Sequence, residues 1–270
     1  MPRTPSPLVI AHRGASACAP ENTLAAFRMA IDAGADGVEL DVRLSKDGVP
    51  VVVHDRDLRR LAHDGRKVAD LTAIELGGVD LGSAFNSASP KHQRAELVGL
   101  GVPTLIDVLE LFAAGKSVVH VEMKIDKKRE LRPLVNAVCG VIHDSPVLPR
   151  VVLSSFRLSA IAEAKYALPA VRTSALFAPS IMRFIKRRRH MIALARAFGA
   201  DEISLYRSLV TTKFAKIARE VGKPVNIWTC DNAKWIDRAQ KLNLKAVMTN
   251  DPAKLLSYRF TKLDNGHLAG

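Results

Sequence analysis

Three acidic side chains stand in candidate strands at a spacing suited to holding a cation. Glu39 and Asp41 lie two apart in the segment 37–42, so both carboxylates share one face of a strand. Glu122 belongs to the next candidate strand, 117–123. Carboxylates this close repel each other unless a metal or basic groups neutralise them. Such a set forms a hard oxygen site that suits Mg²⁺ or Ca²⁺ better than zinc, with structural salt bridges as the alternative.

Two histidines follow apolar segments in the same way. His12 and Arg13 end the first candidate strand, and His54 ends the extended segment 50–53. Imidazoles placed there could act as general acid and general base around a metal-bound group, whereas a single strand-end histidine is more often a polar cap. Arg13 and Lys124 add positive charge, and a guanidinium can hold two phosphate oxygens. The set therefore indicates a phosphate-containing substrate.

The composition is that of a globular protein. The chain has 270 residues, of which 48% are hydrophobic and 25% charged. No apolar run approaches the roughly 18 residues that cross a bilayer, and His12 precedes any possible signal-peptide core. Cys18, Cys139 and Cys230 have no CxxC spacing, so we expect neither a disulfide framework nor a structural zinc site. These features predict a cytoplasmic protein.

The formal charge of +13 favours anionic partners. Aromatic residues make up only 5%, and no basic stretch is interleaved with aromatics that could stack bases, so we do not expect nucleic-acid binding. The basic run 183–190 has two interpretations. Because only a few apolar residues accompany the basic ones, we favour a solvated helix face. Peripheral contact with an anionic membrane surface is the alternative. The sequence specifies no oligomeric state.

Eight β-branched segments alternate with helical patterns, as parallel βα units do. The candidate strands are 8–11, 37–42, 117–123, 150–154, 171–176, 202–206, 224–229 and 245–249. The candidate helices are 21–33, 104–114, 129–144, 157–167, 181–198, 211–221, 232–242 and 252–258. Asn22 is interpreted as the N-cap of the first helix, with support of the active site as the alternative. This order predicts an α/β fold, a (β/α)8 TIM barrel, with an open doubly wound sheet as the alternative.

A long interval, 43–103, separates the second strand from its helix. It holds an extended arm, 49–54, and then a stretch rich in Gly, Ser, Ala and Asp. Loops that follow barrel strands open on the catalytic face, so we expect this small insertion, about 55–102, to lie over the site. We expect a single domain over residues 1–260 and a non-periodic C-terminal tail over 261–270.

An ordered series of short motifs covers nearly the whole chain, from residue 10 to 252. They are His12-Arg13-Gly14, Pro20-Glu21-Asn22-Thr23, Glu39-x-Asp41, Asp47-Gly48, His54-Asp55, Pro103-Thr104-Leu105, Glu122-x-Lys124, Ser155-Phe156, Trp228-Thr229 and Thr249-Asn250-Asp251-Pro252. As a set they resemble the glycerophosphodiester phosphodiesterase family. The order of the motifs is far more specific than any one of them.

The resemblance implies a (β/α)8 barrel that hydrolyses glycerophosphodiesters to glycerol 3-phosphate and an alcohol, using a divalent cation, Mg²⁺ or Ca²⁺. Matched by position, Glu39, Asp41 and Glu122 would ligate the cation. His12 and His54 would be the acid–base pair. The nucleophile would be water or the neighbouring glycerol 2-hydroxyl.

The resemblance also implies the substrate contacts. Arg13 and Lys124 would contact the phosphate, and Trp228 would line the pocket for the glycerol or alcohol moiety. The chain departs from the family pattern at Ala84, where many members carry an aromatic residue. Two alternative functions are a lysophospholipase D type hydrolase on the same barrel and a non-catalytic protein that binds anionic ligands.

Overall fold

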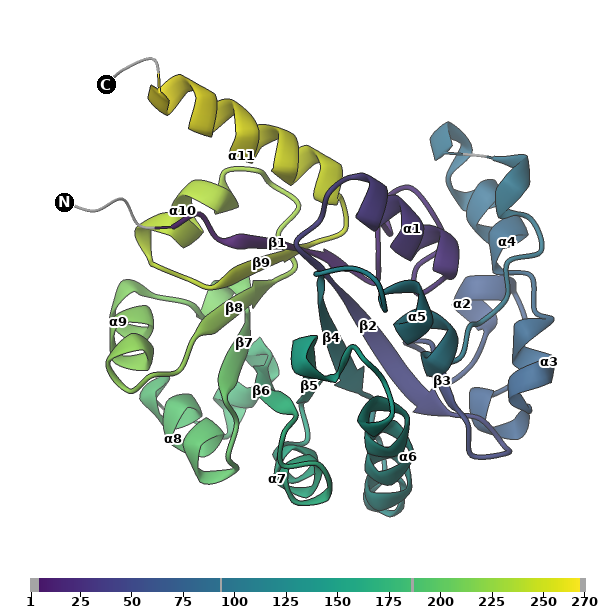
Figure 1. Cartoon of the computed structure of the whole chain (residues 1–270). Coiled ribbons are helices and arrows are strands. Elements are labelled where there is room, and N and C mark those ends of the chain that lie inside the picture. Colours follow the sequence, from purple (N-terminus) through teal and green to yellow (C-terminus); the bar gives the residue numbers. More distant parts are fainter. Residues whose placement is uncertain (1–4, 93, 186, 268–270) are drawn as a thin grey trace.

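Eight parallel strands close into a barrel in the computed structural model, which describes residues 5–92, 94–185 and 187–267 (Figure 1). The strands are β1 (Leu8–His12), β2 (Gly37–Leu44), β4 (Val118–Met123), β5 (Val151–Ser155), β6 (Arg172–Phe177), β7 (Glu202–Tyr206), β8 (Val225–Trp228) and β9 (Ala246–Thr249). The first strand pairs with both β2 and β9, which closes the ring. The predicted TIM barrel is confirmed, and the open sheet is wrong.

Helices surround the barrel as the sequence predicts. They are α1 (Leu24–Asp32), α5 (Leu105–Leu111), α6 (Leu131–His143), α7 (Leu158–Ala167), α8 (Arg189–Ala197), α9 (Thr212–Glu220), α10 (Trp235–Lys241) and α11 (Pro252–His267). Short 3₁₀ helices connect some of them: η4 (Lys128–Glu130), η5 (Leu148–Arg150), η6 (Pro179–Arg183) and η7 (Arg207–Leu209). None of the helices in the described part of the chain is long and apolar enough to span a bilayer.

Two segments differ from the sequence predictions. The single helix expected over 181–198 is divided into η6 and α8, because a run of basic residues without apolar periodicity separates the two. The last helix continues to His267, so the tail expected from residue 261 is helical over 261–267. The prediction relied on an apolar stripe, which the sequence of this segment lacks. The final residues, 268–270, lie outside the described part.

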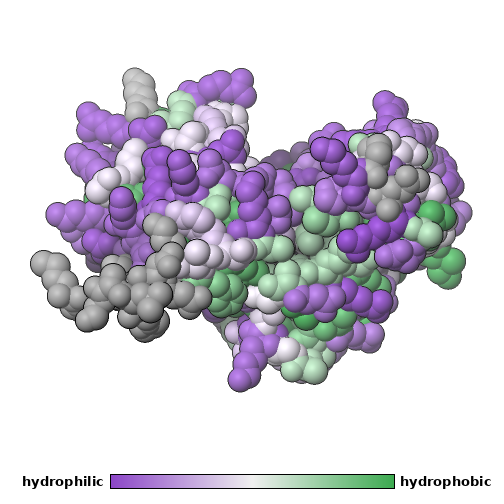
Figure 2. Space-filling view, turned by 90° about the horizontal axis from the view of Figure 1, so that it is seen from above, coloured by the Kyte–Doolittle hydropathy of each residue, from purple (hydrophilic) through white to green (hydrophobic). Residues whose placement is uncertain are grey.

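The core lies between the strands and the outer helices. Val38, Leu40 and Val42 of β2 face outward and pack in one buried cluster with Phe27 of α1 and Phe112. The two phenylalanine rings meet edge to face, with centroids 6.2 Å apart. The alternation expected for β2 is therefore present, and it leaves Glu39 and Asp41 pointing into the barrel. The face of the molecule shown in Figure 2 is mainly hydrophilic, with smaller hydrophobic areas.

The interval after β2 is a packed unit and not a loose loop. It contains the strand β3 (Pro50–Val52), antiparallel to β2, and the helices α2 (Arg59–Ala62), η1 (Val68–Asp70), α3 (Ala73–Gly77), α4 (Leu81–Ala88), η2 (Pro90–His92) and η3 (Ala95–Leu97). Gly82 is required here, since a Cβ atom would lie 1.5 Å from the carbonyl oxygen of Leu97. Figure 1 shows α2, α3 and α4 at one side of the barrel, beside α1 and α5.

We predict that Phe27→Ala lowers the free energy of unfolding by about 3–5 kcal/mol, because it leaves a cavity beside Phe112 in a fully buried cluster. Urea denaturation followed by circular dichroism measures the change. Ile74→Ala is the control, since Ile74 is 88% exposed and its loss should change stability by no more than about 0.5 kcal/mol. Equal effects of the two substitutions would contradict this description of the core.

Candidate active site

Three buried carboxylates meet at the end of the barrel where the strands terminate. Glu39 and Asp41 come from β2, and Glu122 comes from β4. The parallel register places Asp41 directly opposite Glu122. One oxygen from each of the three lies within 4.8 Å of the others. The convergence predicted from spacing is therefore present, with a geometry that can hold a metal ion.

Two cations lie against this cluster, so part of the salt-bridge alternative is also realised. Arg13 Nε is 3.1 Å from Asp41 Oδ2. Lys124 Nζ is 2.8 Å from Glu122 Oε1 and 3.6 Å from Asp41 Oδ1. Neither side chain reaches the carboxylate of Glu39, whose closest basic partner is His12 Nε2 at 3.8 Å. Three acids therefore share two permanent cations.

Burial and the neighbouring charges shift the pKa values of the three acids in different directions. Burial alone would raise the pKa of Asp41, but the charges of Arg13 and Lys124 hold this pKa well below its ordinary value. Burial and then the charge of Asp41 raise the pKa of Glu39 to about 8. Burial also raises the pKa of Glu122 to about 7, against the opposing charge of Lys124. Without a further cation, the cluster thus retains protons near neutral pH.

Asn22 supports this cluster and is not the helix N-cap that the sequence suggested. Thr23 is the N-cap of α1, since its backbone is extended and its side chain accepts a hydrogen bond from Ala26 N–H. Asn22 has a positive φ of 60° and donates from Nδ2 to Asp41 Oδ2 at 3.0 Å. Its Oδ1 accepts from the backbone N–H of Asp41. The left-handed turn at Asn22 thus directs the amide toward Asp41.

His12 is oriented by a residue from the opposite end of the chain. Its Nδ1–H donates to Asn250 Oδ1 at 2.8 Å, so that Nε2 faces the cavity, 3.8 Å from Glu39 Oε2. Asp231 holds Asn250 through the backbone N–H and through Nδ2, at 2.8 and 3.0 Å. Burial and then the charge of Arg13 lower the pKa of His12. The sequence motif contained Asn250, but its role was not predicted.

His54 is backed by a carboxylate. Its Nδ1–H donates to Asp55 Oδ1 at 2.7 Å, and Asp55 in turn accepts from Arg60 Nε at 2.7 Å. Burial lowers the pKa of His54, while Asp41 and Asp55 act to raise it. Arg60 also contacts Glu21, which binds Arg13 at 2.8 Å. Arg60 of α2 thereby connects the insertion to His54 through Asp55 and to Arg13 through Glu21.

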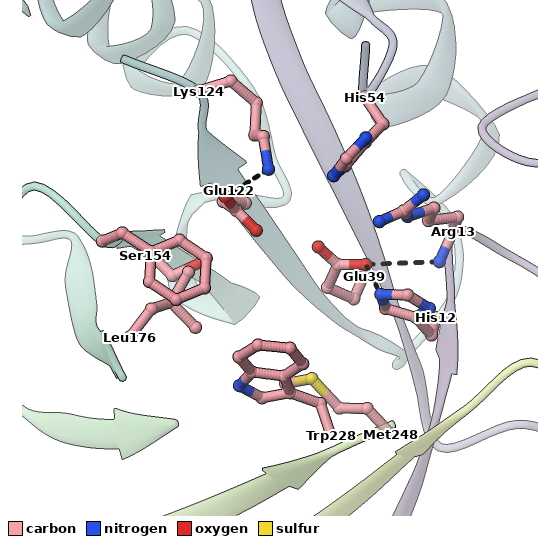
Figure 3. Close-up of a pocket in the computed structure, with 11 residues that line it drawn as sticks. His12, Arg13, Glu39, His54, Glu122, Lys124, Ser154, Leu176, Trp228 and Met248 are labelled. Carbon is pink, nitrogen blue, oxygen red and sulfur yellow. Dashed lines mark hydrogen bonds and ion pairs between the residues drawn. The ribbon is translucent and has the colours of Figure 1, made fainter. Parts of the chain in front are cut away.

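A cavity of about 200 Å³ joins these groups (Figure 3). Seven of the eight predicted site residues line it: His12, Arg13, Glu39, His54, Glu122, Lys124 and Trp228. The eighth, Asp41, lies beneath them and is 1% exposed. Trp228 packs edge to face on Phe156 and Tyr206, with ring centroids 5.7 and 5.3 Å away.

The other lining residues were not singled out as site residues from the sequence. They are Ser154, Phe156, Leu176 and Met248. Three of them lie near the carboxyl ends of β5, β6 and β9, where the barrel rule alone would have indicated them. Ala84, the departure noted in the sequence, is in α4 and does not line this cavity.

Comparison with known proteins is consistent with this geometry. Residues 12–254 match the profile of the glycerophosphoryl diester phosphodiesterase family. The chain is 30% identical over 251 residues to the glycerophosphodiester phosphodiesterase of Caldanaerobacter subterraneus subsp. tengcongensis, covering 93% of this chain and 96% of that one.

Solved structures extend the similarity to the fold. A phosphodiesterase from Oleispira antarctica, in complex with the product sn-glycerol-3-phosphate, superposes with a TM-score of 0.80 at 26% identity, covering 94% of this chain and 96% of that one. A glycerophosphodiester phosphodiesterase from Thermotoga maritima gives 0.69 at 25% identity, covering 93% and 97%.

We predict that Asp55→Asn lowers the pKa of His54, because the substitution removes the carboxylate that stabilises the imidazolium. NMR titration of the imidazole signals measures this shift. Asp57→Asn serves as the control, because it removes the same charge nearby from a residue whose hydrogen bond and ion pair are with Arg59. An unchanged or raised pKa of His54 in Asp55→Asn would contradict the hydrogen bond described here.

Proposed function

The chain belongs to the glycerophosphoryl diester phosphodiesterase family, and we propose that it hydrolyses glycerophosphodiesters to glycerol 3-phosphate and an alcohol. One observation carries this proposal. A single cavity combines a carboxylate cluster, two histidines whose Nδ1 atoms are hydrogen-bonded on the side away from the reaction, and the cations Arg13 and Lys124. The presence of all these groups argues against a protein that only binds anions.

The three acids fit a divalent cation, which we propose is Mg²⁺ or Ca²⁺. Their ligand atoms are close together, and Asp41 Oδ1 is buried without a hydrogen-bond partner in the described part of the chain. Oxygen ligands of this kind suit hard cations, and Glu39, Asp41 and Glu122 would hold one. When bound, the cation would help to neutralise the negative charge of the phosphoryl group.

The two histidines would transfer the protons of the reaction. Hydrolysis forms a bond from phosphorus to the attacking oxygen and breaks the bond to the leaving alcohol oxygen. One Nε2 would accept the proton of the nucleophile, and the other would donate a proton to the leaving alcohol. The nucleophile would be water, which gives glycerol 3-phosphate directly, or the glycerol 2-hydroxyl, which gives a cyclic phosphate that water opens to glycerol phosphate in a second step. Asn250 and Asp55 would keep the two rings oriented for these steps.

Arg13 and Lys124 would stabilise the charge on the phosphoryl oxygens as it develops. Both are held in place by acids, since Arg13 contacts Glu21 and Asp41 while Lys124 contacts Glu122. On the opposite wall, Trp228 would pack against the carbon atoms of the glycerol or alcohol moiety. The volume of the cavity, about 200 Å³, favours an unacylated glycerol over the acylated glycerol of a lysophospholipid.

We predict that His54→Ala and His12→Ala each reduce kcat by roughly 10²–10⁴-fold, because each removes one proton-transfer group. Release of glycerol 3-phosphate from glycerophosphocholine measures the effect, and circular dichroism checks that the fold is retained. His143→Ala is the control, since His143 is exposed at the end of α6. Near-normal turnover of either active-site variant would refute the assignment.

We predict that a chelator abolishes turnover and that Mg²⁺ or Ca²⁺, added separately, restores it. Calorimetry provides a second measurement that does not depend on activity. Glu39→Gln should bind the restoring cation at least about tenfold more weakly than the wild type, because it removes an ionisable ligand. Full activity in the presence of the chelator would contradict a metal-dependent reaction. The same assay with lysophosphatidylcholine tests the lysophospholipase D alternative.

A further inference from the structure

A strongly cationic surface lies outside the active site, over the segment that follows β6. Between residues 178 and 219 the chain has ten Lys or Arg residues and only two acids, Asp201 and Glu202. Both acids lie at the start of β7 and are already paired there: Asp201 with Lys165, and Glu202 with Arg172 and Lys245. Neither acid is therefore available to neutralise the cations after β6.

The cations of this surface are exposed. They are Arg183, Arg187, Arg188, Arg189 and Lys213. No ion pair joins any of them to an acid within residues 5–92, 94–185 and 187–267. Lys186, in the same run, lies outside these ranges. A group of unpaired cations raises the local potential and favours an anionic partner.

Apolar side chains lie among these cations. Phe184 is 79% exposed, although Ile185 beside it is buried and anchors the segment. A groove of about 480 Å³ lies next to this segment, between α8 and α9. Its apolar lining is Met182, Ile192, Phe214 and Ile217, and its charged lining is Arg187, Arg188, Arg189 and Lys213. The surface therefore offers both charge and apolar contact.

The position of this surface relates it to the active site. The segment begins directly after β6, so it lies at the end of the barrel where the cavity opens. Phe156, which lines the cavity, is also at this end and is 44% exposed. Figure 1 shows the neighbouring helices α8 and α9 at the side of the barrel opposite the insertion.

We propose that this cationic surface, formed by Arg183, Phe184, Arg187, Arg188, Arg189 and Lys213, docks on membranes that contain anionic phospholipids. The cations would contact the head groups, and Phe184 would insert among them. A nucleic acid would use the charge but not the apolar lining of the groove. The proposal extends beyond the proposed hydrolysis and does not depend on it, because none of these residues belongs to the catalytic cavity.

Vesicle co-sedimentation tests the docking. The full chain is mixed with phosphatidylcholine vesicles, or with vesicles that also contain roughly 30% phosphatidylglycerol. We expect binding only to the anionic vesicles, with loss of binding as the salt concentration rises. Absence of binding to anionic vesicles at low salt would overturn the proposal. Preferential capture of an RNA oligonucleotide in a competition with these vesicles would also overturn it.

Matched variants locate the contact. The triple variant Arg187→Gln, Arg188→Gln, Arg189→Gln should bind anionic vesicles at least about tenfold more weakly, because three cations leave the surface. The control variant Lys116→Gln, Arg219→Gln, Lys241→Gln removes the same charge from exposed positions near the other end of the barrel. Equal loss in both variants would show that net charge alone causes the binding and would overturn the assigned surface.

A third variant separates apolar contact from charge. Phe184→Ser leaves the net charge unchanged and should weaken binding several-fold, because it removes the exposed ring. Unchanged binding of this variant would overturn the role of Phe184 in docking. Turnover of water-soluble glycerophosphocholine should be the same in all these variants, which separates a failure of docking from a failure of the catalytic site.

Discussion

The repulsion among three buried carboxylates is the constraint on which the rest of the site depends. Glu39, Asp41 and Glu122 lie closer together than isolated charges tolerate, and the barrel keeps them there. Arg13 and Lys124 compensate most of the charge of Asp41 but leave Glu39 without a permanent cation. In the proposed function, this imbalance favours an additional positive ion, and the same two cations contact the bound phosphate.

Barrel closure produces this arrangement from separate strands. Because β1, β2 and β4 are parallel neighbours, their carboxyl ends meet at one rim, and the register aligns His12 with Glu39 and Asp41 with Glu122. The outward residues of the same strands form the core with the helices. Packing on one face of β2 therefore determines the positions of the acids on the other.

Periodicity was enough to predict the eight strands, since alternation is a property of single strands. The eight proposed site residues also required the order of the motifs and the resemblance to a family. The supporting contacts depend on tertiary structure. Asn22 was mistaken for a helix cap because its left-handed backbone cannot be read from residue type. The partner of His12 lies 238 residues away in the chain. The division of 181–198 reflects the basic run between η6 and α8, and the extension of α11 to His267 reflects a segment without an apolar stripe.

The hydrogen bond from His12 to Asn250 joins the first strand to the residue that follows the last one. A nascent chain still attached to the ribosome, with β9 inside the exit tunnel, would have neither a closed ring nor an oriented imidazole. The proposed catalytic centre would then form only after β9 has left the tunnel. Loss of β9 and Asn250 should therefore be as damaging as loss of a reactive side chain.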